Sequence, residues 1–355
     1  MPGRPPDRGV DVETDVLVVG GGPVGLAAAI EARRAGLGVV VLEPRPAPID
    51  KACGEGLMPG ALAAVRRLGV DPAGWPLHGI SYRQSDVVAD HRFAGGPGRG
   101  VRRTTLHAGL HDAAQEAGAV VLARRVTTVE QAPDGVVAGG VRARWLLGCD
   151  GLHSRVRRAV GLEVPAGPGE GSRARRRRFG LRRHYRTAPW TDLVEVHWGP
   201  RAEAYVTPVA GDLVGVALLG PPGVGVEEGL ASLPELADRL AGAAADGPVL
   251  GAGPLRVRSA ARAAGRVRLV GDASGYVDAL TGEGLRVGLA QARVVVEHLE
   301  DGAAYERAWA RVTRDYRALT TGLVTAARSP LRRGVVPAAA RLPRLYGQVV
   351  ERLAR

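Results

Sequence analysis

Asparagine is absent from the sequence, lysine occurs once, as Lys51, and cysteine occurs twice, as Cys53 and Cys149. Two cysteines supply neither a disulfide framework nor a zinc site, and their scarcity indicates the reducing cytoplasm. Aromatic residues make up only 4% of the chain, which argues against surfaces that stack nucleic-acid bases. Apolar runs stay shorter than the roughly 18 residues that a membrane-spanning helix requires. We therefore expect no nucleic-acid partner, no membrane span and no metal.

A signal peptide is also missing from the pattern. Residues 1–11 are polar and rich in proline and glycine, without the apolar centre that such a peptide has. We expect these residues to form a disordered tail.

Arginine is present in excess and supplies nearly all the positive charge behind a net charge of +12 over 355 residues. Such exclusive use of arginine is typical of GC-rich coding, so the basic balance is a weak indicator of a nucleic-acid partner. The length and the 45% hydrophobic content predict a large core, most simply two closely joined domains.

A glycine-rich turn near the N-terminus connects a predicted buried strand at 15–19 to a predicted helix at 23–35. The spacing fits G-x-G-x-x-G, in which the glycines allow a tight turn, close approach of a pyrophosphate, and close packing of helix on strand. The phosphates would lie at the positive end of the helix. The cofactor-binding residues predicted from this turn are Gly20, Gly22, Pro23, Val24 and Gly25.

Glu43 follows the second predicted strand, 38–42, about 20 positions beyond the glycines. A carboxylate at this place accepts hydrogen bonds from the ribose hydroxyls of an adenosine. Arg45 is a further candidate for the adenosine end, and the alternative for it is plain surface charge. The pattern favours a dinucleotide site over an ordinary strand-helix-strand unit with an acidic loop.

The middle of the chain changes character. Four segments, 178–185, 192–198, 202–207 and 213–219, predict a mostly antiparallel sheet at one side of a substrate cavity, and 226–244 predicts a helical stretch. A strand at 267–270 and a helix at 284–299 follow. The remainder to residue 355 is predicted to be helical and broken by Pro330, Pro337 and Pro343.

Three separated motifs resemble those of FAD-dependent monooxygenases of the p-hydroxybenzoate hydroxylase type, close to the geranylgeranyl-reductase-like flavoproteins. They are the glycine turn with Glu43, the segment CDGLHSRVR at 149–157, and the segment RLVGDA at 268–273. The resemblance implies an α/β fold. A Rossmann-like FAD-binding domain of the glutathione-reductase type would carry an inserted, mostly antiparallel β-sheet substrate domain and C-terminal helices.

The implied domains are discontinuous in the sequence. We assign 12–75, 100–165 and 255–300 to the FAD-binding domain, 76–99 and 166–254 to the substrate domain, and 301–355 to the C-terminal helical region.

The resemblance also implies residues along the bound FAD. Asp272 would hold a ribityl hydroxyl, with a helix cap as its alternative, and Asp150 would link FAD and nicotinamide binding. Arg103 would lie near the pyrophosphate, with Arg102 as the competing candidate. The Val126 backbone would meet the adenine. The amide groups that open a helix would face the flavin edge that becomes negative on reduction, and the candidates there are Gly282, Gly284 and Leu285.

The loop at 51–56, KACGEG, resembles a segment of the geranylgeranyl-reductase-like branch, and is therefore implied to lie against the isoalloxazine ring. Its candidate catalytic residues are Lys51, Cys53 and Glu55. Lysine offers a compact charge that arginine does not replace, and Glu55 could act as an acid or base. Cys53 is either a packing residue or a redox or substrate contact.

Several other patterns predict no site. The arginine run 173–178 is expected to be a solvated loop that enters a strand. The histidines, among them His107, His184 and His197, show no metal-ligand spacing, and Ser154 lacks the partners of a serine hydrolase.

The function implied by the resemblance is oxygenation of a small molecule. NADPH or NADH would reduce FAD, O2 would form the flavin C4a-hydroperoxide, and oxygen would pass to an aromatic or polycyclic, natural-product-like substrate. The loop at 51–56 favours an alternative, a flavin reductase of prenyl double bonds. A flavin halogenase is disfavoured because no W-x-W-x-I-P segment is present. The oligomeric state stays open.

Overall fold

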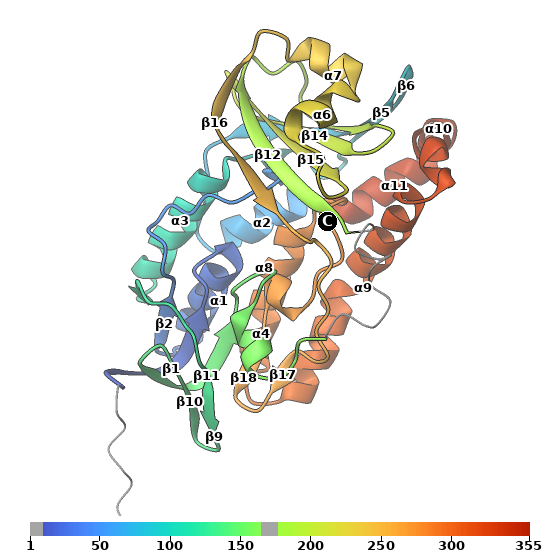
Figure 1. The fold of residues 1–355 in the computed structure, drawn as a ribbon. Coiled ribbons are helices and arrows are strands. Elements are labelled where there is room, and N and C mark those ends of the chain that lie inside the picture. Colours follow the sequence, from blue (N-terminus) through green and yellow to red (C-terminus); the bar gives the residue numbers. More distant parts are fainter. Residues whose placement is uncertain (1–9, 165–176) are drawn as a thin grey trace, which may run out of the picture.

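The computed structural model describes residues 10–164 and 177–355. Its first sheet has a parallel core (Figure 1). The strands lie in the order β8 (Val120–Leu122), β2 (Val39–Leu42), β1 (Val12–Val19), β11 (Val141–Gly148) and β18 (Val267–Leu269). Every residue of β2 is buried, as expected for a parallel strand covered on both faces.

Three short strands extend this sheet. β17 (Ala263–Ala264) pairs antiparallel with β18, and the hairpin of β9 (Glu130–Ala132) and β10 (Gly135–Ala138) pairs with β11. The three motifs stand at the carboxyl ends of β1, β11 and β18. Because these strands are parallel neighbours, the motifs lie at the same edge of the sheet.

Helices pack around the parallel core and against one another. They are α1 (Pro23–Arg34), α2 (Pro59–Arg67), α3 (Arg103–Glu116), α4 (Arg155–Ala159), α8 (Gly284–Glu297) and the 3-10 helix η1 (Gly271–Ser274). α1 packs against α8 and α3, and its Leu26 and Ile30 are fully buried in the largest core cluster.

The second large sheet is antiparallel except for one pair. Its order is β16 (Ala244–Ala252), β12 (Phe179–Arg186), β15 (Leu213–Gly220), β14 (Glu203–Ala210), β13 (Leu193–Trp198), β5 (Gly79–Gln84) and β6 (Val87–Arg92), with β13 and β5 parallel. Buried side chains of α6 (Val226–Ala231) and α7 (Pro234–Arg239) share a core cluster with β12, β14 and β15. A small sheet of β3 (Gly56–Leu57), β7 (Gly98–Gly100) and β4 (Trp75–Leu77) contacts β14.

The C-terminal part is helical, as the sequence predicts. α9 (Gly302–Ala327) packs along α8, and η2 (Pro330–Gly334), α10 (Val335–Arg341) and α11 (Pro343–Ala354) follow (Figure 1). α10 and α11 pack on β6. No helix in residues 10–164 or 177–355 is both long and apolar enough to cross a bilayer.

The mixed α/β fold class is confirmed. The predicted helical stretch 226–244 contains α6 and α7, and it is followed by β16, an edge strand that the sequence does not predict because its mostly exposed side chains lack a clear alternation. One local prediction is wrong. Pro337 does not break the C-terminal helices, because it lies in the first turn of α10, where a missing N–H costs no hydrogen bond. The domain boundaries stay predictions. Most of the predicted tail, 1–9, lies outside the described residues.

Candidate cofactor and substrate site

A cavity of about 590 Å3 is lined by residues from both large sheets. The lining segments are the glycine turn after β1, the loop from Lys51 to Met58, the start of α3, the turns after β11 and β18, the start of α8, and strands β12 to β15. The three motifs are far apart in the sequence, and the fold brings all of them to this one cavity.

Two glycines of the turn are required by close backbone packing, and a third leaves the backbone open to the cavity. A Cβ on Gly20, whose φ is +106°, would lie 2.6 Å from the Cys149 carbonyl oxygen, and one on Gly25 would lie 1.9 Å from the Gly20 oxygen. A Cβ on Gly22 would meet only the Arg103 guanidinium, at 3.9 Å. The backbone at Gly22 is therefore open to a ligand.

Glu43 is buried beside this turn and accepts hydrogen bonds on both oxygens. Its Oε2 accepts from the Gly21 amide at 3.1 Å, and Arg45 reaches Oε1 through Nε at 2.8 Å and Oε2 through Nη2 at 3.0 Å. Burial alone would raise the pKa of Glu43, but the bonds from Arg45 and Gly21 outweigh it and lower that pKa. The carboxylate is therefore an anion held in place, with Arg45 as its partner, and buried Val126 lines the same end of the cavity.

The geometry separates the two arginines at the start of α3. Arg102 reaches away to Asp246 of β16, with Nη1 3.3 Å from Oδ2. The Arg103 side chain lines the cavity, and its buried Nε has no hydrogen-bond partner among the described residues. Burial lowers the pKa of Arg103, yet a guanidinium remains a cation. Arg103 is thus the better candidate for a pyrophosphate.

Asp150 has one oxygen in use and one unused. Its Oδ2 caps α4 by accepting from the amides of Arg155 at 2.6 Å and Val156 at 3.1 Å. Its Oδ1 is buried and has no hydrogen-bond partner within residues 10–164 and 177–355. The neighbouring Arg157 donates hydrogen bonds to the Leu152 and Ala273 carbonyls and so has a structural role.

Asp272 lies inside η1, whose N-cap residue is Val270, so Asp272 does not occupy the cap position that was its alternative role. Burial raises the pKa of its carboxyl, while the charges of Lys51 and Arg103 oppose that rise. The Lys51 ammonium lies 3.5 Å from the place that a Cβ of Gly151 would take. Lys51 and Arg103 therefore set a positive field around a carboxyl group that lines the cavity.

The start of α8 is open to the cavity. Gly282 has a φ of +68° with no atom within 4 Å of its would-be Cβ, and the N-cap residue Glu283 makes no side-chain capping bond. Gly284 and Leu285 also line the cavity. The first amides of this 14-residue helix can thus face a ligand that carries negative charge.

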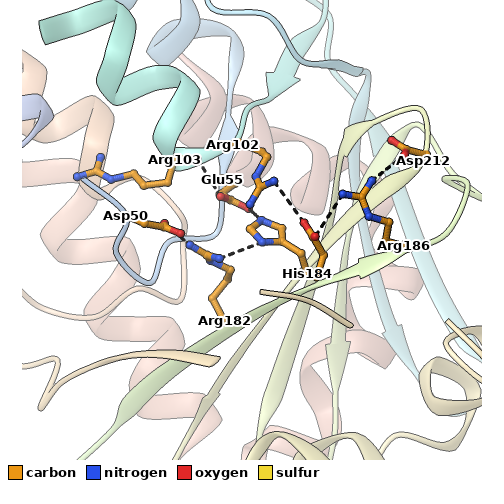
Figure 2. A network of polar contacts seen from close by, with 9 residues as sticks. Asp50, Glu55, Arg102, Arg103, Arg182, His184, Arg186 and Asp212 are labelled. Carbon is orange, nitrogen blue, oxygen red and sulfur yellow. Dashed lines mark hydrogen bonds and ion pairs between the residues drawn. The ribbon is translucent and has the colours of Figure 1, made fainter. Parts of the chain in front are cut away.

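The loop that contains Cys53 is fastened at both ends, as Figure 2 shows. Glu55 has a φ of +59°, and its Oε1 accepts from the Arg103 amide at 2.8 Å while Oε2 lies 2.6 Å from His184 Nε2. Asp50 pairs with Arg182. Cys53 faces the cavity between these contacts, and burial raises the pKa of its thiol.

One wall of the cavity is largely apolar. It consists of side chains from the second sheet and the segments beside it, with Tyr205 donating to the Leu280 carbonyl. Its members in the cavity lining are Leu181, Val194, Tyr205, Thr207, Ala217, Leu219, Ala252 and Leu255. Such a wall suits an apolar substrate with few polar groups.

One expectation about the arginine run is wrong. Arg178 is buried and pairs with Glu203 at 2.6 Å and with Asp278 at 3.1 Å, so its charge is compensated inside the protein. Residues 173–176 of that run lie outside the described residues. Within residues 10–164 and 177–355, no group of three or more His, Cys, Asp or Glu side chains gathers that could hold a metal ion.

Sequence reasoning missed the partners of the loop. Arg182, His184 and Thr207 carry no motif, because only the pairing of β12, β15 and β14 brings them to the loop. Their one sequence signal is that Arg182 and His184 are two apart on a strand and so point to the same face.

FAD fits the cavity on three grounds. Gly22, Gly54 and Gly282 present open backbone. Asp150 and Arg103 have buried polar atoms that find no hydrogen-bond partner among residues 10–164 and 177–355. The start of α8, whose N-cap side chain makes no capping bond, adds amide donors. The chain therefore has the features of a dinucleotide-binding flavoprotein.

Comparison with known proteins agrees with this class. Residues 13–175 match the model of a family described as an FAD binding domain. A menaquinone reductase from Mycolicibacterium smegmatis is 36% identical over 171 residues, which cover 43% of this chain and 41% of that protein. A rifampicin monooxygenase from Streptomyces venezuelae is 31% identical over 173 residues, 43% of this chain and 35% of that protein.

Similar solved structures extend over the whole chain. The p-nitrophenol 4-monooxygenase PnpA from Pseudomonas putida aligns with a TM-score of 0.75 at 20% identity, covering 97% of each chain. The flavin-dependent brominase Bmp2 aligns with a TM-score of 0.79 at 18% identity, covering 97% of this chain and 94% of that one. At such identities the likeness shows the fold alone. The chain spans about two fifths of the length of the first curated relatives it matches.

Proposed function

We propose that this protein is an FAD-dependent monooxygenase. It would use NADH or NADPH and O2 to oxygenate an aromatic or polycyclic, natural-product-like small molecule, in the cytoplasm. The observation that carries the proposal is the single cavity, in which the FAD-binding motifs meet an apolar wall of the second sheet. Relatives that are FAD-dependent monooxygenases support it.

The candidate residues along the cavity would each hold a different part of FAD. Glu43 would hold the adenosine ribose, Arg103 and the Gly22 backbone the pyrophosphate, and Asp272 a ribityl hydroxyl. Bound FAD would supply the electron transfer and the oxygen activation. The start of α8 would stabilise negative charge at the flavin edge, and the apolar wall would orient the substrate and exclude water.

The loop residues remain the candidates for contact with the reacting groups. Lys51 and Cys53 line the cavity and are free to face a substrate. Glu55 also lines the cavity, but both of its oxygens already accept hydrogen bonds from Arg103 and His184. This favours a supporting role for Glu55 over the acid or base role predicted from the sequence.

A second candidate function is reduction of prenyl double bonds. It is favoured by the KACGEG loop and by two kinds of relatives, a menaquinone reductase and a digeranylgeranylglycerophospholipid reductase from Methanopyrus kandleri. The apolar wall suits a prenyl chain as well as an aromatic ring.

Oxidation of NADH and NADPH with and without O2 separates the two candidates. The FAD-loaded protein is mixed with indoles, phenols and prenyl lipids. A monooxygenase consumes O2 and yields an oxygenated product. Substrate-stimulated oxidation that proceeds without O2 and saturates a prenyl double bond would reject the monooxygenase and support the reductase.

Lys51→Arg tests the loop independently. We expect bound FAD to be retained and turnover to change, because arginine spreads its charge over a planar group where lysine offers a point charge. Steady-state kinetics and the flavin spectrum measure both properties. Unchanged kinetics would remove the ammonium from the mechanism.

A further inference from the structure

Two buried side chains of β12 contact the loop from Asp50 to Glu55. Arg182 and His184 are two residues apart and point to the same face of the strand (Figure 2). Arg182 is 2% exposed and His184 is fully buried, and neither lines the cavity. They touch each other, with Arg182 Nη1 2.9 Å from His184 Nδ1, and they contact opposite ends of the loop, Asp50 and Glu55.

The donors fix the tautomer of His184. A guanidinium only donates hydrogen bonds, so Nδ1 of His184 must accept from Arg182. The ring proton is then on Nε2, which donates to Glu55 Oε2 at 2.6 Å. His184 is therefore neutral in this arrangement, and its ring links the Arg182 guanidinium to the Glu55 carboxylate through two hydrogen bonds.

Glu55 connects this pair to the cofactor side. Its second oxygen accepts from the amide of Arg103, the first residue of α3, and its own carbonyl accepts from the Val101 amide at 2.8 Å. A non-glycine residue at φ +59° requires such support, because this backbone region is unfavourable for residues with a Cβ. Room for the contact comes from Gly215 of β15, where a Cβ would lie 2.9 Å from Glu55 Oε2.

We propose that Arg182 and His184 are positioning residues that lock the loop from Asp50 to Glu55 in place. Through Glu55 they set the position of the Cys53 thiol and of Arg103 in the cavity. The inference rests on the proposed FAD site for its consequence, but the lock itself is a property of the chain without cofactor.

The chain offers a matched control in the same sheet. His197 of β13 is also buried and also contacts a buried glutamate, with Nε2 3.0 Å from Glu195 Oε2. This second pair lies outside the cavity lining. A general structural effect of losing a buried histidine should therefore be equal at both positions, whereas positioning of the loop involves His184 and not His197.

The test measures the reactivity of Cys53 in the cofactor-free protein. Cys149→Ala serves as background, so that Cys53 is the one thiol left. We expect His184→Leu to raise the rate of Cys53 alkylation about tenfold, since a released loop opens locally. His197→Leu should leave the rate unchanged, and His184→Gln, which keeps a donor toward Glu55, should restore most of the protection.

Glu55→Gln provides an isosteric variant in case His184→Leu fails to fold. Both carboxylate oxygens accept, so an amide places one NH2 group against a donor whichever way it turns. It should also speed alkylation. Equal rates for wild type, His184→Leu and Glu55→Gln, or equal acceleration by His197→Leu, would overturn the lock.

FAD affinity tests the consequence. We expect His184→Leu to weaken FAD binding about tenfold, by analogy with the loss of an outer-shell partner at a metal site, and to shift the flavin absorption bands. Unchanged affinity and an unchanged spectrum would overturn the link to the cofactor. Faster alkylation in a protein that takes up no FAD would support the lock and reject the proposed function, so the two failures are distinguishable.

Discussion

At the scale of single residues, two glycines of one turn have different physical tasks. Gly25 is needed because its helix touches the strand turn, and Gly22 is open toward the cavity. A methyl group therefore acts on folding at one position and on ligand binding at the other. The motif alone does not reveal this division, since both positions are simply G in the pattern.

The paired substitutions Gly22→Ala and Gly25→Ala test that division. Gly25→Ala should lower the free energy of unfolding by about 2–3 kcal/mol, because the new Cβ meets a backbone oxygen. Gly22→Ala, at a φ of −72°, should leave cofactor-free stability nearly unchanged and weaken FAD binding. Denaturant unfolding and FAD titration check both. A destabilised Gly22→Ala that binds FAD normally would contradict the assignment.

The Asp272 carboxylate should destabilise the cofactor-free protein and strengthen its binding of FAD. Burial raises the pKa of its carboxyl in the folded state, so the folded state holds that proton more tightly than the unfolded state does. Stability must then fall as pH rises above the unfolded pKa. Asp272→Asn should stabilise the cofactor-free protein, more at pH 8 than at about pH 4, and should weaken FAD binding.

Thermal unfolding at the two pH values measures this prediction. A variant that is less stable than the wild type at pH 8 without FAD would show that the carboxylate is stabilised by contacts within the chain, and would contradict a ligand-binding role.

At the scale of elements, a buried charge cluster joins segments that the sequence leaves unconnected. Arg178, just before β12, pairs with Glu203 of β14 and with Asp278 after η1, and Arg332 of η2 reaches Glu203 at 2.5 Å. The cluster ties the second sheet to the segment between η1 and α8 and to η2. An arginine run reads as a solvated loop from the sequence, because nothing local indicates which member turns inward.

Removing Arg178 should destabilise the fold far more than removing Arg186, a surface arginine at the end of β12. Arg178→Leu leaves two buried carboxylates short of a partner and should destabilise the fold by about 3–5 kcal/mol. Arg186→Leu removes the pairs with Asp212 and Asp246, and because the Arg186 side chain is exposed it should change stability by less than about 1 kcal/mol. Urea unfolding compares the two variants, and equal effects would contradict the cluster's role.

The elements also show what a sequence can reveal. The first strand, glycine turn and first helix are predictable because their signals are local: a buried apolar run, glycines at fixed spacing, and proline at a helix start. β16 and the lock formed by Arg182 and His184 are not, because an exposed edge strand lacks alternation and the lock exists only through strand pairing.

At the scale of the whole molecule, the fold collects the glycine turn, Asp150 and Asp272 around one cavity, since β1, β11 and β18 run parallel and end at the same edge. This could be foreseen from the order of the motifs. The chemistry on the substrate side could not, because the wall is built from apolar side chains of β12 to β15 that carry no motif.

The central claim is that one FAD molecule bridges the Gly22 turn and Asp272. Titration of the cofactor-free protein with FAD, followed by flavin fluorescence, tests it most directly. The account predicts one FAD per chain, with affinity weakened by Gly22→Ala at one end and by Asp272→Asn at the other, in folded proteins. A wild-type protein that takes up no FAD, or one whose affinity neither substitution alters, would contradict it.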